Sequence, residues 1–229
     1  MPEDIHIARA ALHMWEEPCI SGTVGSGTVF FSGCTLRCVF CQNYAISTLR
    51  QGKTISVEEL AEKFLDLQHM GAWNINLVTP GHYVPQIIRA LDIARRQGLK
   101  LPVVYNTSGY ERVDTLKMLE GYVDIYLPDF KYVNTQLSEK YSGAPDYFDV
   151  ASQALWEMVR QVPETVFEGA RMLKGVIVRH LLLPGCLMDS KRVVRYLYET
   201  YGDRIYMSLM SQYTPLPHVA EHFPELNMK

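Results

Sequence analysis

The order of apolar and polar residues predicts short strands alternating with longer helices from about residue 28 onward. Short runs of β-branched and aromatic residues indicate strands, and apolar residues at three- and four-residue spacing indicate helices. The strands are expected at residues 28–32, 73–79, 102–107, 123–129, 174–183 and 204–209. The helices are expected near 57–70, 84–97, 113–119, 148–160 and 191–201. This alternation is typical of an α/β fold with a parallel sheet.

Local signals mark the ends of two of these helices. Ser56, followed three residues later by Glu59, predicts a capping box at the start of the first helix. Gly71 and Gly98 follow the first and second helices, where glycine commonly ends a helix.

Six strands are too few to close an eight-stranded barrel, so we expect an open six-stranded (β/α)6 partial TIM barrel. Residues 1–27 are expected to form an N-terminal extension, and residues 28–229 the barrel domain. In the extension, we predict a short helix over residues 5–15 that is ended by Pro18. The glycine-rich stretch 21–27 is predicted to be a turn that leads into the first strand.

Three of the five cysteines follow the first predicted strand with the spacing C-x3-C-x2-C, at Cys34, Cys38 and Cys41. Three thiolates on one loop can hold a soft metal centre, and in a [4Fe-4S] cube they leave one iron open to another ligand. A three-cysteine zinc site is an alternative, although Cys19 and His13 have no partner at the usual zinc spacing. A disulfide framework is less expected, because disulfide-stapled folds are usually much smaller than 229 residues.

Composition and charge narrow the function classes. A net charge of −3 offers no electrostatic reason to bind nucleic acid or an anionic membrane. No apolar run approaches the roughly 20 residues of a membrane span, and the N-terminus lacks the basic and apolar regions of a signal peptide. We therefore expect a cytoplasmic protein with reduced cysteines that binds neither nucleic acid nor membrane.

Polar residues stand where the predicted strands end, which is where parallel α/β folds bind ligands. Alternation along a strand places Asp129 and Lys131 on the same side, although an exposed ion pair is the ordinary fate of such residues. Asn106 and Ser108 suit a turn equally well. Arg179 and its neighbour His180 must face opposite ways, and we expect Arg179 to face the barrel interior, where it can pair with a carboxylate.

With the cysteine loop and these strand ends, the chain resembles the radical S-adenosylmethionine (SAM) enzymes. More narrowly, it resembles the group named as pyruvate formate-lyase activating enzyme homologues. The resemblance extends over roughly residues 8–215 and rests on the segments at 15–22, 31–43 and 77–85.

The resemblance implies that Cys34, Cys38 and Cys41 hold a [4Fe-4S] cluster whose open iron is chelated by SAM. It further implies reductive cleavage of SAM to a 5′-deoxyadenosyl radical, which abstracts hydrogen from a substrate such as a glycyl-radical enzyme or a peptide. Reduced flavodoxin or ferredoxin is the implied electron donor. The implied cofactor-binding residues are Phe40, Thr79, Gly81, His82, Asn106, Ser108, Asp129, Lys131, Arg179 and Gln212. The alternative is a non-catalytic iron–sulfur or zinc protein that acts as an electron carrier or sensor.

Two departures from the family pattern stand out. Many relatives carry Gly-Gly-Glu-Pro at the end of the second strand, where the backbone receives the amino group of SAM, whereas this chain has Thr79-Pro80-Gly81-His82. Members of the group also resemble this chain preceded by a cysteine-rich segment, so we expect a short natural form or a shortened one.

Overall fold

A computed structural model describes residues 4–227. Residues 1–3 of the predicted N-terminal extension and residues 228–229 of the predicted barrel domain lie outside the described residues. The six predicted strands form the parallel part of one sheet, in the order β2-β4-β5-β6-β8-β9. They are β2 (Ser26–Phe31), β4 (Ile75–Val78), β5 (Val103–Thr107), β6 (Ile125–Pro128), β8 (Arg171–Leu181) and β9 (Tyr206–Met210). Among the described pairings, β9 joins the sheet only through β8, so the barrel is open, as predicted.

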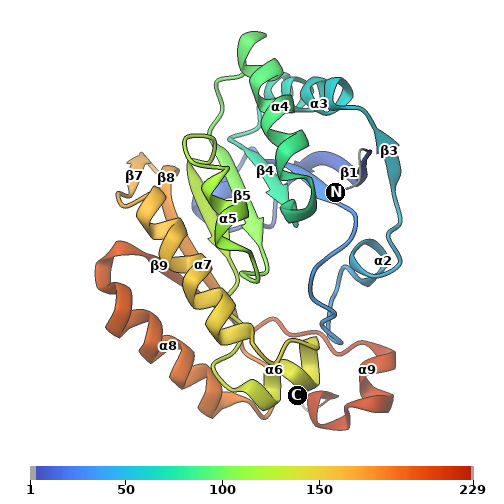
Figure 1. Cartoon of the computed structure of the whole chain (residues 1–229), viewed down its shortest axis with the longest axis vertical. Helices are drawn as coiled ribbons and strands as arrows, with labels where there is room; N and C mark the ends of the chain where they lie inside the picture. The colour runs from blue at the N-terminus through green and yellow to red at the C-terminus, as the bar shows by residue number, and fades with distance from the viewer. Residues whose placement is uncertain (1–3, 228–229) are drawn as a thin grey trace.

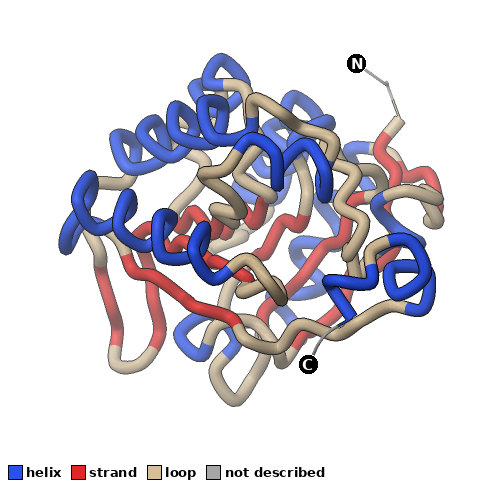
Figure 2. The backbone as a smooth tube through the Cα atoms, turned by 90° about the horizontal axis from the view of Figure 1, so that it is seen from below, coloured by secondary structure: helices blue, strands red, loops and turns tan. Residues whose placement is uncertain are grey.

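Helices surround the sheet on its outer side, as Figures 1 and 2 show. The predicted helices are present as α3 (Val57–His69), α4 (Val84–Arg96), α5 (Val113–Lys117), α7 (Tyr147–Gln161) and α8 (Leu187–Tyr201). The capping box of Ser56 and Glu59 is confirmed at the start of α3. Several short elements were not predicted, namely the helices α2 (Tyr44–Ser47), α6 (Thr135–Ser142) and α9 (Pro217–His222) and the 3-10 turns η1 (Gly81–Tyr83), η2 (Gly202–Arg204) and η3 (Pro224–Asn227).

The helix predicted over residues 5–15 is wrong, because this segment is strand β1 (Ile5–His13). β1 runs antiparallel to β2 on one edge and to β3 (Lys53–Ile55) on the other. Its alanines favour a helix, but alternate Ile5 and Ile7 are buried in the core, and tertiary pairing of this kind overrides local propensity. A third unpredicted strand, β7 (Val166–Glu168), forms an antiparallel hairpin with β8.

Pro18 begins a helix rather than ending one. It is the first residue of α1 (Pro18–Ser21), a position that suits the fixed φ of proline. Ile20 of this turn is fully buried and belongs to the same apolar cluster as Val104 of β5 and Leu127 of β6. The side-chain amide of Asn74 donates to the Ile20 carbonyl at 2.7 Å. The segment therefore fills the interior of the open barrel.

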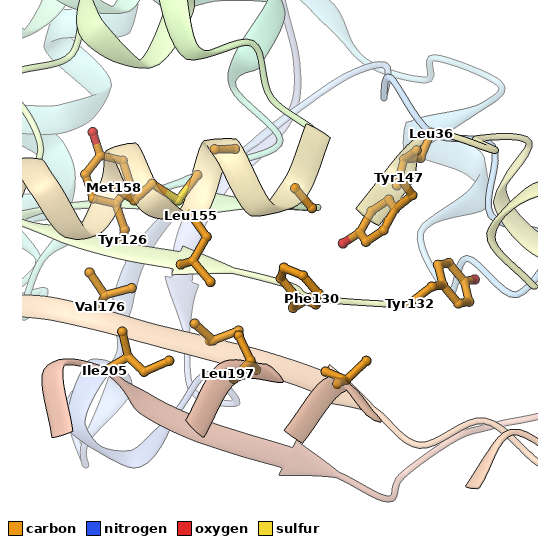
Figure 3. Packing of buried hydrophobic residues seen from close by; sticks show 14 of the residues in the cluster. Leu36, Tyr126, Phe130, Tyr132, Tyr147, Leu155, Met158, Val176, Leu197 and Ile205 are labelled. Carbon is orange, nitrogen blue, oxygen red and sulfur yellow. The ribbon is translucent and has the colours of Figure 1, made fainter. Parts of the chain in front are cut away.

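The outer face of the sheet carries the larger part of the core. Tyr126 of β6 and Val176 of β8 pack against Leu155 and Met158 of α7, and Leu197 of α8 belongs to the same cluster (Figure 3). Along each strand, every second residue thus packs against the helices. The residues between them face the barrel interior.

Candidate active site

A cavity of about 220 Å³ lies at the carboxyl ends of the parallel strands. It collects most of the residues that the sequence singled out, from four strand ends and the cysteine loop. The predicted residues that line it are Cys34, Cys38, Cys41, Phe40, Thr79, Asn106, Ser108, Asp129, Lys131 and Arg179. Gly81, His82 and Gln212 are not among the lining residues.

The cysteine loop is held by backbone contacts and two buried apolar anchors. The Val39 N–H donates to the Tyr141 carbonyl at 2.9 Å, and the Cys41 N–H donates to the Cys38 carbonyl at 3.1 Å. Leu36 and Phe40 are buried in the core. All three thiols of the motif are free and partly buried, so the loop presents them to the cavity while its apolar residues anchor it.

The environment of the thiols combines desolvation with a nearby cation. Burial raises the pKa of the Cys34 thiol to about 11, and the ammonium of Lys131 opposes that shift. Burial also raises the pKa of Cys38, again opposed by Lys131 and by the Ser142 hydroxyl, which donates to the Cys38 sulfur at 3.1 Å. Lys131 thus favours thiolate at two of the three cysteines, and thiolate is the form that binds metal.

Within residues 4–227, no three His, Cys, Asp or Glu side chains converge into a site for a single metal ion. The three thiols of the motif all line the wall of one cavity.

Asp129 links two cations at the base of the cavity. Its Oδ2 lies 2.7 Å from the Lys131 ammonium, and its Oδ1 lies 2.9 Å from Nη2 of Arg179. Burial by itself would raise the pKa of Asp129, but the charges of Arg179 and Lys131 outweigh that effect and hold it below the usual value. The predicted same-side placement of Asp129 and Lys131 and the inward orientation of Arg179 are both present in the structure. His180 faces the opposite side, where its Nδ1 lies 2.7 Å from the Phe130 carbonyl.

Glu16 is a residue of the site that was not predicted. Its side chain is 8% exposed and lies 3.2 Å from Nη1 of Arg179. Asn106 donates to the other Glu16 oxygen at 3.2 Å and accepts from Arg179 Nη2 at 2.7 Å. Glu16 stands outside the barrel strands, so the search for polar residues at strand ends could not find it. The only sequence signal was its place in a segment that carried the family resemblance.

The turn after β4 departs from ordinary backbone geometry. Thr79 has φ 57°, in the left-handed region that glycine adopts readily and a β-branched residue rarely does. Its N–H donates to the Asn106 carbonyl at 2.8 Å, which ties the turn to β5. The strained residue is therefore one that lines the cavity.

The other three predicted residues lie beside the cavity or away from it. The backbone of Gly81 rests on the carboxyl of Glu111, where a Cβ would lie 2.7 Å from Oε2. His82 packs against Gly33, immediately before the first cysteine, where a Cβ would meet its Nε2 at 2.9 Å. Gln212 is exposed in the segment after β9. Gly81 and His82 thus support the cavity wall from behind, and the structure does not bring Gln212 to it.

The buried carboxyl of Glu111 leads us to expect that the stability of the fold depends on pH. Burial raises its pKa from 4.5 to about 7, opposed only in part by the hydrogen bond that Thr107 donates. Between these two pH values the unfolded chain loses this proton while the folded protein keeps it. The free energy of unfolding should therefore fall, by up to about 3 kcal/mol, as the pH rises through that window. Glu111→Gln should remove this decline in urea unfolding measured from pH 4.5 to 8.

A matched control is Glu62→Gln, which removes an exposed carboxyl on α3. Its stability should follow the wild-type pH profile. If the Glu111→Gln profile also runs parallel to wild type, Glu111 does not titrate as its burial indicates.

At Gly109 we expect one added methyl group to lower the stability of the fold strongly. It has φ +79°, and a Cβ there would lie 2.2 Å from the backbone oxygen of Asp129. Gly109→Ala should force the ends of β5 and β6 apart, with a loss of about 3 kcal/mol in unfolding free energy. Gly98→Ala, at φ +102° with no atom within 4 Å, carries the backbone strain alone and should cost only about 1 kcal/mol. Equal losses in chemical denaturation would show that the contact with Asp129 is unimportant.

Comparison with known proteins places the chain among described families. The sequence profile of the Radical SAM superfamily matches residues 28–197. The chain is 30% identical over 227 residues to "Uncharacterized protein MJ0674" of Methanocaldococcus jannaschii, covering 95% of this chain and 61% of that protein. It is 27% identical over 174 residues to the pyruvate formate-lyase-activating enzyme of Clostridium pasteurianum, covering 74% of this chain and 66% of that enzyme. The chain thus spans less than two thirds of the length of both curated relatives.

The solved structure of methylornithine synthase (PylB) has a similar fold. It aligns with a TM-score of 0.53 at 17% sequence identity, over 80% of this chain and 53% of that chain. At this identity the likeness concerns the fold alone, and it agrees with the open, mostly parallel partial barrel described above.

Proposed function

This chain belongs to the Radical SAM superfamily, whose members use a [4Fe-4S] cluster and SAM, and from that premise we propose that it is an enzyme of radical SAM chemistry. The observation that carries the proposal is the convergence of the three thiols with Asn106, Asp129 and Lys131 on one cavity. These residues come from separate stretches of the chain. An electron carrier or sensor would need the thiols alone.

The residues present fit the cofactors of the family. Cys34, Cys38 and Cys41 would hold the cluster, since three soft thiol donors line one cavity together. When bound, the reduced cluster supplies the electron that cleaves SAM to methionine and a 5′-deoxyadenosyl radical, which then takes hydrogen from a substrate. The polar strand ends opposite the thiols would receive SAM.

The protein's own part is to orient the bound groups, to favour the thiolate form of the cysteines and to exclude water from the cavity. Asp129 holds the Lys131 ammonium at 2.7 Å, and that cation favours the thiolate form of Cys34 and Cys38. Asn106 has both ends of its amide engaged by protein partners, so it is fixed before any ligand arrives. Phe40, buried in the cysteine loop, closes one wall with an apolar ring.

The finer assignment is that of an activating-enzyme-like oxidoreductase. The similarity to a pyruvate formate-lyase-activating enzyme supports it, and with it a protein or peptide substrate. Reduced flavodoxin or ferredoxin is the electron donor that the family resemblance implies. In the part of the chain that the structure describes, no helix is long and apolar enough to cross a membrane. The cytoplasmic location stays a prediction.

The proposal is tested by anaerobic reconstitution with iron and sulfide, followed by dithionite and SAM. We expect about four irons per chain and formation of 5′-deoxyadenosine. Tight retention of zinc with no 5′-deoxyadenosine would instead support a non-catalytic module. Affinity capture with the reconstituted protein would then test whether a glycyl-radical enzyme is bound.

A further inference from the structure

Glu16 is a buried acid beneath the cavity that the proposed chemistry leaves without a role. It does not line the cavity itself, but it contacts Arg179 and Asn106, which do. It is delivered by the segment that leads into α1, whose Ile20 fills the barrel interior. The N-terminal segment that fills the barrel interior thus also places a charged side chain beneath the cavity.

The four charged side chains at this floor balance one another. Glu16 and Asp129 are the acids, and Arg179 and Lys131 are the bases, so their formal charges sum to zero. The contacts between them are short, at 3.2 Å for Glu16 with Arg179 and 2.7 Å for Asp129 with Lys131. Removal of the Glu16 carboxylate would leave one uncompensated positive charge in a poorly solvated site, where charges act strongly on their surroundings.

Arg179 is held on all three of its nitrogens by protein groups. Nε and Nη2 contact Asp129, Nη2 also contacts Asn106, and Nη1 contacts Glu16. A guanidinium has five N–H donors, and three of them are hydrogen-bonded to Asp129, Glu16 and Asn106, which leaves two for any ligand. Most of the hydrogen-bonding capacity of Arg179 is therefore taken up by protein groups. Arg179 also lines the cavity, and its positive charge is offset by both Asp129 and Glu16.

SAM and S-adenosylhomocysteine differ by one positive charge, which SAM carries on its sulfur atom. SAM is a sulfonium with a net charge of about +1 at neutral pH, whereas the thioether has lost the sulfonium charge. Resting on the proposed function, we infer that Glu16 is a specificity-determining positioning residue that makes the cavity favour the sulfonium over the thioether. It acts by fixing Arg179 and by neutralising its charge.

The test compares the affinities of the reconstituted protein for the two ligands by equilibrium dialysis, without reductant. In Glu16→Gln, SAM affinity should fall about tenfold while S-adenosylhomocysteine affinity changes less than about threefold, which is the scale of one lost charged interaction. Glu16→Asp keeps the charge and should keep the wild-type ratio of the two affinities. Glu62→Gln, the same change at an exposed position on α3, should leave both affinities unchanged.

The outcomes separate this inference from the proposed function. Equal losses for SAM and S-adenosylhomocysteine in Glu16→Gln would show a merely structural role and overturn the inference, as would no change at all. If Glu16→Gln fails to fold, a lowered ratio in Glu16→Asp overturns it and an unchanged ratio supports it. Failure of the wild-type protein to bind or cleave SAM would overturn the proposed function itself, and iron content measured in every variant reports on the cluster independently.

Discussion

Replacement of Cys38 by alanine is expected to abolish cluster assembly and, with it, all cleavage of SAM. Cys38 is the middle thiol of the motif and lines the cavity beside Cys34 and Cys41. Its sulfur already has a hydrogen-bond donor in Ser142 and a nearby cation in Lys131, so its surroundings are prepared for a thiolate. With two thiols left, a four-iron cube would have two irons without a protein ligand. Iron and sulfide per chain and 5′-deoxyadenosine formed after reduction measure the effect.

The matched control is Cys19→Ala, which removes a thiol that packs against the interior cluster rather than lining the cavity. It should retain wild-type iron content and SAM cleavage. Wild-type iron and turnover in Cys38→Ala would show that the assignment of the cluster ligands is wrong.

Replacement of Asp129 by alanine is expected to weaken SAM binding and to lower the stability of the fold. The carboxylate holds Lys131 on one oxygen and Arg179 on the other, and its side chain is only 19% exposed. Its loss would leave the largely buried Lys131 without its carboxylate partner and Arg179 with Glu16 alone, which costs about 3 kcal/mol in unfolding free energy. SAM binding should weaken by roughly 1–3 kcal/mol, the cost of a lost charged hydrogen bond. Urea unfolding and equilibrium dialysis measure the two effects, and the cluster should still assemble.

Two variants show whether these effects come from the pairing. Asp66→Ala breaks an exposed pair with Lys63, in which Asp66 is 58% exposed, and should change stability by no more than about 0.5 kcal/mol. Asp129→Asn keeps the shape and loses the charge, so it should weaken SAM binding nearly as much as alanine does. Unchanged SAM affinity in Asp129→Ala would place this residue outside the binding site.

Much of the site could be predicted because it lies on regular strands. Alternation continued just past the end of β6 places Asp129 and Lys131 on one side, and alternation along β8 turns Arg179 inward and His180 outward. The carboxyl ends of parallel strands meet at one edge of the sheet, so residues far apart in sequence could be grouped from the strand pattern alone.

The missed features depend on contacts between distant segments. Whether residues 5–13 form a helix or a strand is decided by two partner strands, so local propensity was misleading there. Glu111 carries no motif, and its raised pKa arises from burial that the chain acquires only on folding. Gln212 follows a strand end as the others do, yet the chain beyond β9 leads it away from the cavity.

The sequence by itself determined the cysteine spacing, the six parallel strands and the polar residues that close each strand, because these depend on local pattern and on the period of two along a strand. The tertiary structure alone decided that the N-terminal segment around α1 fills the barrel interior and brings Glu16 into contact with Arg179 and Asn106. An open barrel leaves its interior to be filled by whatever segment can bury Ile20 there, and no local signal specifies that partner. The charge balance of the site is therefore a property of the folded chain, although every charge in it can be read from the sequence.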